Sequence, residues 1–462
     1  MMIEINELHS IFNFFIKTGW ISSFSQCTSA PSQSIMTCHA ALFLFFLYWA
    51  SSIPSSASRI ITVAAPLWKD PTTLQYVMEF EHKTPLRKDK VVIDLAGDFL
   101  WLHCKTAAYK SSTYLFIPCH TSLCTASGSA LFGCGDCSKI PPGKKSCRNN
   151  TCKELATNGV TGTEIFNAEL SQDTVALYPS DGKKASLASK IVVTQFAFAC
   201  APPSLLQGLA KGAVGMAGLN WGQLALPFQL NVALELERKF GLCLPAGDAP
   251  GGVFFGSPNY LRGPDKEFPY IKLNYTFLRT PRYPMEYYLN VQSIEINGKR
   301  LPIDPEHLRL NLQGSGGTKL STVVAYTQAA TPIYTAIRDG FVREAEEMGI
   351  SRVVSIKPFD ACFDAATVGS IKTGPAVPVI DLVLDNEFVF WRISGANSVV
   401  KVKEGVMCLA FVDAGEFPVA SMVVGSHQLQ DNLLQFDLVE FKLHFSSSLL
   451  ASNTACSNFV FA

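Results

Sequence analysis

The sequence predicts a mostly-β protein with two lobes. Short apolar runs, rich in β-branched and aromatic residues, recur between Gly, Pro, Asn and Asp, which is typical of strands joined by turns. These runs are LQYVMEF, KVVIDL, SKIVVTQFAFAC, GGVFFG, YYLNVQSIEIN, PVIDLVL, FVFWRI and ASMVVG. The chain has 462 residues, which is more than one hydrophobic core usually serves, so we expect two lobes.

Two windows interrupt the strand pattern and predict short helices. In Leu226–Phe240 and in Ala330–Gly349, apolar residues recur at spacings of three and four. We expect both helices to pack against sheets.

The charge balance of the chain favours no polyelectrolyte partner. Lys+Arg and Asp+Glu both number 38, charged residues make up 16% of the chain, and the sequence pI is about 7.0. Bulk charge therefore attracts neither nucleic acid nor an anionic membrane surface, and we expect no nucleic-acid partner.

The N-terminal region predicts export. The run Ala40–Ala50 is apolar, has the length of a signal-peptide core, and precedes small residues suited to cleavage. Because Met36 lies at the usual distance from such a core, we interpret residues 1–35 as a gene-model extension and residues 36–58 as the signal peptide. A signal anchor is the alternative, although the run is short for a membrane span, and we expect no stable membrane insertion.

The cysteine count agrees with secretion. Two of the 14 cysteines, Cys27 and Cys38, lie before the signal core, and an even number remains, which predicts six disulfides of unassigned pairing. A zinc site at Cys134 and Cys137 is the alternative, but no His cluster is nearby, so we expect no metal. The remaining cysteines are Cys104, Cys119, Cys124, Cys134, Cys137, Cys147, Cys152, Cys200, Cys243, Cys362, Cys408 and Cys456.

The domain organisation follows from cysteine density and turn residues. Residues 119–152 hold six cysteines and little apolar content, which predicts a cross-linked surface insertion in the N-terminal lobe. The turn-rich stretch after GGVFFG favours a lobe boundary, so we expect lobes at 59–258 and 259–462. The sequons at Asn149 and Asn274 predict glycan sites on exposed loops.

Three segments resemble the pepsin-like aspartic proteases. Val91–Cys104 (VVIDLAGDFLWLHC) is similar to their first active-site loop, where a hydrophobic strand enters Asp-Thr-Gly-Ser. Gly212–Leu230 and Val423–Phe445 resemble the central and closing stretches of the same fold. The resemblance spans the chain after the signal peptide and implies a bilobal pepsin-like fold with two β-barrel-like lobes and short helices.

Finer features resemble a plant subfamily. These are Cys134–Cys137, Cys147–Cys152, Gly317–Thr322 and Leu449–Phe459, which are similar to segments of extracellular dermal glycoproteins, basic 7S globulins and wheat xylanase inhibitors. The resemblance implies a protein secreted to the apoplast or cell wall and generally without protease activity. It also implies a protein partner, a microbial cell-wall-degrading glycoside hydrolase such as a xylanase or a xyloglucan endoglucanase.

Asp94 is the candidate catalytic residue, but its partner is missing. Aspartic proteolysis needs two carboxylates that share a proton. Counting back from Tyr334, which resembles the tyrosine after the second loop, the second aspartate's place falls on Ser321. Leu95 and Ala96 replace the Thr and Gly that follow the first aspartate. We therefore predict no catalytic residues, with Asp94 and Ser321 as relic positions and Asp94 accepting hydrogen bonds from loop backbone.

Other chemistries fail on spacing. GSGGTKLS lacks the Gly directly before Lys that a phosphate-binding loop requires, and no G-x-S-x-G elbow appears. His427 follows a loop glycine, and we interpret it as a packed histidine at the base of a lobe. We expect no cofactor.

The resemblance also marks candidate inhibitory contacts. Endoglucanase-inhibiting relatives use arginines where this chain has Lys372 and Val419, and xylanase-inhibiting relatives present a histidine where it has Ser452. Lysine keeps the positive charge of arginine but loses its two parallel hydrogen bonds, and valine loses both. This chain therefore lacks the contact residues of both kinds of inhibiting relative. The alternative is a basic 7S globulin-like storage, wall or signalling protein that binds peptide or wall polysaccharide. A residual aspartic endopeptidase is a more distant alternative.

Overall fold

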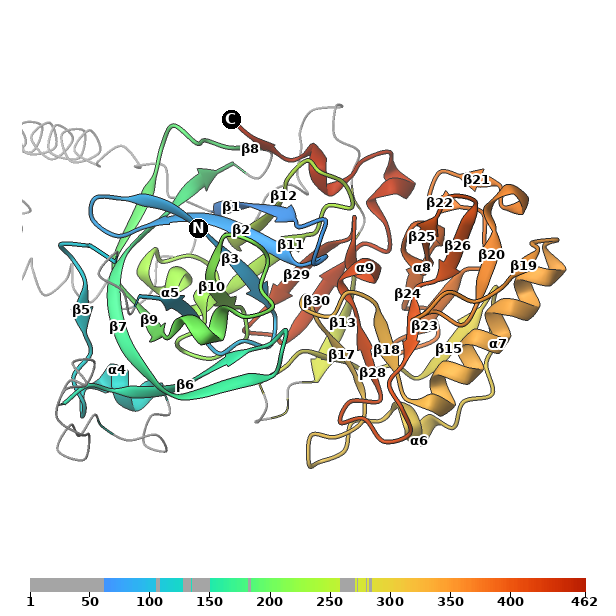
Figure 1. Cartoon of the computed structure of the whole chain (residues 1–462), viewed down its shortest axis with the longest axis horizontal. Coiled ribbons are helices and arrows are strands. Elements are labelled where there is room, and N and C mark those ends of the chain that lie inside the picture. Colours follow the sequence, from blue (N-terminus) through green and yellow to red (C-terminus); the bar gives the residue numbers. More distant parts are fainter. Residues whose placement is uncertain are drawn as a thin grey trace, which may run out of the picture. The chain divides into compact units, whose positions relative to one another are not determined.

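The computed structural model describes residues 62–104, 109–127, 134, 150–181, 184–257, 271, 273–279, 281 and 285–462. Within these residues the chain is mostly strand, as the apolar runs predicted (Figure 1). The gene-model extension, the signal peptide, Cys137, Cys147, Asn149 and most of the predicted lobe boundary lie outside the described residues. No helix in the described part is long and apolar enough to cross a membrane.

The described part of the N-terminal half is a set of strands with three short helices. The strands are β1 (Thr62–Lys69), β2 (Tyr76–His82), β3 (Arg87–Asp94), β4 (Leu100–His103), β5 (Leu115–Phe116), β6 (Lys153–Asn158), β7 (Thr163–Ser180), β8 (Lys184–Ala185), β9 (Ile191–Ala201), β10 (Ala213–Gly218), β11 (Lys239–Cys243) and β12 (Gly251–Gly256). The helices are α4 (Ser122–Ala126), η3 (Pro203–Leu206) and α5 (Leu226–Ala233).

The C-terminal half repeats this composition and adds one long helix. Its strands are β13 (Asn274–Arg279), β14 (Tyr288–Leu289), β15 (Ser293–Ile296), β16 (Lys299–Arg300), β17 (Thr318–Leu320), β18 (Thr327–Ala329), β19 (Arg352–Val353), β20 (Cys362–Asp364), β21 (Ser370–Ile371), β22 (Gly374–Pro375), β23 (Ile380–Val383), β24 (Phe390–Ile393), β25 (Val399–Lys403), β26 (Val406–Leu409), β27 (Phe411–Asp413), β28 (Met422–Val424), β29 (Leu433–Asp437), β30 (Lys442–Phe445) and β31 (Val460–Phe461). Its helices are α6 (Pro305–Leu308), α7 (Thr331–Glu347), η4 (Ala365–Thr367), α8 (Gly395–Ser398), α9 (Ser426–Leu429), η5 (Leu449–Ser452) and η6 (Cys456–Asn458).

The two halves share one strand arrangement around the candidate site. In the N-terminal half, β3 runs parallel to β10, and β10 runs antiparallel to β4. In the C-terminal half, β17 runs parallel to β28, and β28 runs antiparallel to β18. Asp94 ends β3, whereas Ser321 directly follows β17. Each of the two residues therefore lies at the C-terminal end of the first strand in its arrangement.

Strands from both halves pair in a shared sheet. β11 of the N-terminal half runs antiparallel to β29 of the C-terminal half, and β8 runs parallel to β31. β13 and β30, both of the C-terminal half, pair antiparallel in the same sheet. The Phe240 and Phe436 rings stack 4.5 Å apart across the first of these pairings. Residues of both halves therefore bury apolar surface in one continuous core, which removes it from water.

One predicted helix is confirmed and the other was too long. α7 covers the window Ala330–Gly349, ends before Gly349 at φ 74°, and lies beside β15 (Figure 1). α5 ends at Ala233, not Phe240. Glu235 takes φ 52°, and the chain then continues as β11, which pairs with β12 and β29. Non-local strand pairing therefore overrides the helical period.

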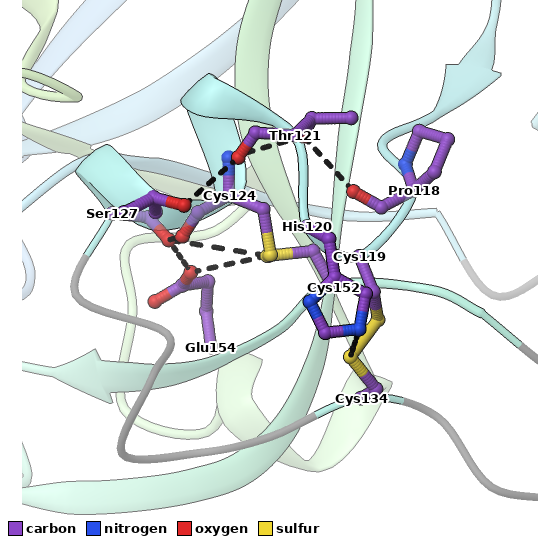
Figure 2. The surroundings of a disulfide bond; sticks show 10 residues. Pro118, Cys119, His120, Thr121, Cys124, Ser127, Cys134, Cys152 and Glu154 are labelled. Atoms are coloured by element: carbon purple, nitrogen blue, oxygen red, sulfur yellow. Dashed lines mark hydrogen bonds between the residues drawn. A yellow bond between two sulfur atoms is a disulfide. The ribbon is translucent and has the colours of Figure 1, made fainter.

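Ten of the predicted disulfide cysteines form five bonds: Cys104–Cys200, Cys119–Cys134, Cys124–Cys152, Cys243–Cys456 and Cys362–Cys408. Figure 2 shows two of these bonds side by side in the insertion, with Thr121 capping α4. Because Cys134 is bonded to Cys119, its thiolate cannot serve the alternative zinc site. No group of three metal-ligating side chains occurs among the described residues.

Candidate functional site

A cavity of about 470 Å³ lies where β3 and β17 end. Side chains from both halves line it, including Asp94, Trp101, Glu286, Lys319 and Ser321. The structure thus brings the two predicted relic positions to one cavity, although they are distant in the sequence.

Asp94 lies on the floor of this cavity and is only 5% exposed. Its Oδ1 accepts a hydrogen bond from the backbone N–H of Ala96 at 3.0 Å. Burial raises the pKa of the Asp94 carboxyl to about 6; the Ala96 hydrogen bond opposes this rise, and the Glu286 charge adds to it. The predicted hydrogen bond from the loop backbone is therefore present, and the purely structural role of Asp94 stays a prediction.

The turns after β3 and β17 are joined by a threonine. The Thr322 hydroxyl accepts a hydrogen bond from the Leu95 N–H at 3.2 Å and donates one to the Ile93 carbonyl at 2.9 Å. The neighbouring Ser321 hydroxyl instead accepts from Val323 N at 3.3 Å and from Val324 N at 3.2 Å. Ser321 therefore stabilises its own turn.

An ion pair in the cavity was missed by the sequence reasoning. Lys319 Nζ lies 2.6 Å from Glu286 Oε1, and the Tyr288 hydroxyl donates to Glu286 Oε2 at 3.0 Å. β14 pairs with β17, which sets Tyr288 opposite Lys319. The only local signal was a lysine inside an otherwise apolar and small-residue strand, and this signal does not identify a partner 33 residues away.

The turn between β6 and β7 covers Asp94. Gly159, in this turn, packs so closely that a Cβ atom there would collide with Asp94 Oδ2. The buried Asn158 holds the turn, because its Nδ2 donates to Leu205 O at 2.8 Å and its Oδ1 accepts from Val160 N at 2.9 Å. The turn thus restricts access to the carboxylate from this side.

The three candidate inhibitory residues lie in different elements. Lys372 is exposed in the turn between β21 and β22, Val419 is 71% exposed in the loop between β27 and β28, and Ser452 is half-buried at the end of η5. Figure 1 shows β21 and β22 well separated from β28. The structure therefore does not gather Lys372 and Val419 into one cluster.

The loop that holds Val419 and the loop before β17 carry exposed apolar residues that the sequence reasoning missed. Phe417, in the same loop, is 97% exposed, and Leu312, in the loop before β17, is fully exposed. Gly316 N donates to Val419 O at 2.7 Å and so ties the two loops together. We call Leu312, Phe417 and Val419 the apolar loop surface. A phenylalanine between Glu416 and Pro418 in a turn-rich stretch was the available signal.

The structure also places His427 and the sequon residue Asn274. His427 is in α9, where its Nε2 lies 3.0 Å from Val399 O, and burial lowers its pKa to about 4. It is packed, as interpreted. Asn274 begins β13 and is half-exposed, so the expectation that this sequon lies on a loop was wrong. Strand pairing of Asn274 with Phe445 decides this placement.

Comparisons with known proteins match this chain along most of its length. A family model described as xylanase inhibitor N-terminal matches residues 76–257, and one described as xylanase inhibitor C-terminal matches residues 286–447. The probable aspartic proteinase GIP2 of Nicotiana benthamiana is 42% identical, over 92% of this chain and 98% of its own. Gamma conglutin 1 of Prunus dulcis is 41% identical, over 85% and 88%.

Solved structures agree. The crystal structure of edgp covers 88% of this chain and 100% of its own, with a TM-score of 0.82 and 39% identity. That of basic 7S globulin from soybean covers 87% and 100%, with a TM-score of 0.73 and 29% identity. These likenesses confirm the predicted pepsin-like bilobal fold and the predicted resemblance.

Proposed function

This chain belongs to the xylanase-inhibitor-like family of aspartic-proteinase-related proteins, and we propose that it is a secreted inhibitor of a microbial glycoside hydrolase, a xylanase or a xyloglucan endoglucanase. Secretion is supported by the predicted signal peptide and by the five disulfides, which persist in oxidising compartments. The apoplast and cell wall are the proposed location.

We further propose that the chain has no aspartic peptidase activity. The mechanism needs two carboxylates that share one proton across a water molecule. The proposal is supported by Ser321, which lines the same cavity as Asp94 and which the sequence predicts at the second aspartate's place, because a hydroxyl cannot supply the second carboxylate. Glu286 does not substitute, because Lys319 and Tyr288 bind its two oxygens. Peptide cleavage measured between pH 3 and 6 tests this proposal, and cleavage that Asp94→Asn abolishes would contradict it.

The apolar loop surface is the single observation that carries the inhibitor proposal. Large exposed apolar side chains that gather on adjoining loops are typical of protein interaction sites. Here the Gly316–Val419 hydrogen bond holds the two loops in place, so little ordering is required on binding. The substrate clefts of glycoside hydrolases present paired carboxylates. Lys372 supplies an exposed cation, and it forms no ion pair with any described residue, but it lies on a separate turn.

The experiment is a titration of fungal xylanases and xyloglucan endoglucanases with the protein from about Ser58 onward. We expect stoichiometric inhibition of at least one enzyme. Phe417→Ala should then raise the inhibition constant at least tenfold, as removal of a central aromatic contact does. Phe388→Ala is the matched control, because Phe388 is 82% exposed and belongs to a different loop, the turn between β23 and β24.

Two outcomes distinguish an error in the proposed binding surface from an error in the proposed inhibitor function. Inhibition that Phe417→Ala leaves unchanged would retain the inhibitor and reject the apolar loop surface, and Lys372→Ala would be the next variant. Full enzyme activity at hundredfold excess would reject the inhibitor. The relatives named gamma conglutin and basic 7S globulin then favour a storage, cell-wall or peptide-binding signalling protein.

A further inference from the structure

A second cavity, of about 290 Å³, lies between α5 and the turn that joins β29 to β30. Its lining is Trp221, Phe228, Asn231, Arg238, Leu438, Val439 and Phe441, and it shares no residue with the cavity around Asp94. The volume is at the lower end for small-molecule sites, so a ligand the size of a single ring fits it.

The walls of this cavity are aromatic. Trp221 and Phe441 meet edge to face with ring centroids 5.8 Å apart, and the Arg238 guanidinium lies 4.7 Å from the Phe228 ring centroid. Backbone pairing holds Arg238 in register, because Leu438 N donates to Arg238 O at 2.9 Å. These contacts give fixed apolar faces with a cation at the rim.

Two buried polar atoms of the lining have no partner among the described residues. Trp221 Nε1 is a donor without an acceptor, and Asn231 Oδ1 is an acceptor without a donor. Asn231 is only 2% exposed, and its Nδ2 donates to Lys239 O at 3.2 Å, which fixes the amide orientation. An unsatisfied buried polar group costs free energy, so each atom calls for a ligand group of opposite type.

Arg238 adds an available positive charge. It forms no ion pair within the described residues, and the neighbouring acids have other cations: Glu237 lies 3.0 Å from Lys239, and Glu440 lies 2.7 Å from Lys442. A guanidinium in this state favours a carboxylate, which it can bind through two parallel hydrogen bonds.

We propose that this cavity binds a uronic acid, either as a free monosaccharide or as the end of an acidic oligosaccharide. The apolar faces of a sugar ring would pack on Trp221 and Phe228. Hydroxyl groups both donate and accept, so the hydroxyls of a sugar can donate to Asn231 Oδ1 and accept from Trp221 Nε1. The sugar carboxylate would pair with Arg238. The proposal is independent of the inhibitor proposal, because the apolar loop surface contributes none of the lining.

Saturation-transfer NMR titration of the purified protein with sodium galacturonate tests the proposal. For a single sugar ring we expect a Kd in the low millimolar range. Galactose, which lacks the carboxylate, should bind at least tenfold more weakly, and so should acetate, which lacks the ring. Trigalacturonate separates the two sources, because an oligosaccharide end should bind at least as tightly as the monosaccharide.

Two variants assign the contacts. Arg238→Gln should reduce galacturonate binding to the level of galactose, whereas Arg300→Gln, an exposed arginine on β16, should not change it. Trp221→Phe keeps the aromatic wall but removes the N–H, and should weaken binding about fivefold. Thermal unfolding midpoints of the variants check that each is folded. The absence of galacturonate binding at 20 mM, equal binding of acetate, or unchanged binding in the Arg238→Gln variant would each overturn the proposal.

Discussion

The Thr322 hydroxyl accepts a hydrogen bond from the backbone N–H of Leu95, although the two residues lie 227 positions apart in the sequence. The same hydroxyl donates to Ile93 O, so one threonine satisfies two buried backbone groups, one at the end of β3 and one in the turn that follows it. Leu95 has no hydroxyl with which to return the contact. Only Thr322 therefore contributes a hydroxyl to the hydrogen bonds between the two segments. These hydrogen bonds are present in a chain that we propose has lost the second carboxylate.

Thr322→Val should destabilise the protein by about 2–3 kcal/mol. Valine has nearly the same shape, but it leaves the Leu95 N–H and the Ile93 carbonyl buried without this partner. The free energy of unfolding in urea measures the effect. The exposed Thr72→Val is the control and should change it by less than about 0.5 kcal/mol. Equal losses in both variants would show that the hydroxyl contributes nothing specific.

Asp94→Asn should stabilise the protein at neutral pH. Because folding raises the pKa of Asp94 from 3.8 to about 6, the folded state disfavours the ionised carboxylate, and the wild type loses stability as pH rises through this window. Asparagine cannot ionise and can still accept from Ala96. At about 1.4 kcal/mol per pKa unit, the variant should gain about 3 kcal/mol at pH 7 and almost nothing at pH 3.5.

Urea denaturation at the two pH values measures this gain. Asp248→Asn, at an exposed position, is the matched control and should change the free energy of unfolding by less than about 0.5 kcal/mol at pH 7. A gain from Asp94→Asn that is equal at pH 3.5 and pH 7 would contradict the electrostatic explanation.

His427→Gln should protect the protein against acid. Burial lowers the pKa of His427 from 6.5 to about 4, so the folded state disfavours the charged imidazole. The wild type is therefore stabilised above pH 6.5, and this contribution, about 3 kcal/mol, is lost as pH falls to 4. Glutamine cannot take up the proton and can still donate to Val399 O. The difference between variant and wild type, followed from pH 7 to pH 4, should grow in favour of the variant.

Removal of the Cys243–Cys456 disulfide should cost about 2–5 kcal/mol. The bond links β11 to η6 across 213 residues, and cross-links that close long loops restrict the unfolded chain most. The double Ser variant of Cys119 and Cys134, whose bond spans 15 residues, is the comparison and should lose less. The free energy of unfolding under non-reducing conditions ranks the two. The reverse order would mean that native-state strain, not loop closure, decides the effect.

Much of the fold could be predicted because its signals are local. The run KVVIDL, which contains Asp94, supplied Val91–Asp94 at the buried end of β3, and the helical period of Ala330–Gly349 became α7. The same local method extended α5 seven residues too far, since it could not detect that Lys239–Cys243 pairs with β29. That Ser321 occupies the place of the second catalytic aspartate stays a prediction. The structure shows that Ser321 and Asp94 line one cavity.

By itself, the sequence determined the β-rich composition, the disulfide-forming cysteines and the absence of any Asp-Thr-Gly loop, since each depends on residue type and spacing alone. Only the tertiary structure decided which distant side chains meet. It paired Lys319 with Glu286, placed Gly159 over Asp94 and set Arg238 beside Phe228. Such contacts depend on strand register and on close packing between segments, and a shift of one residue in either would turn these side chains away from each other.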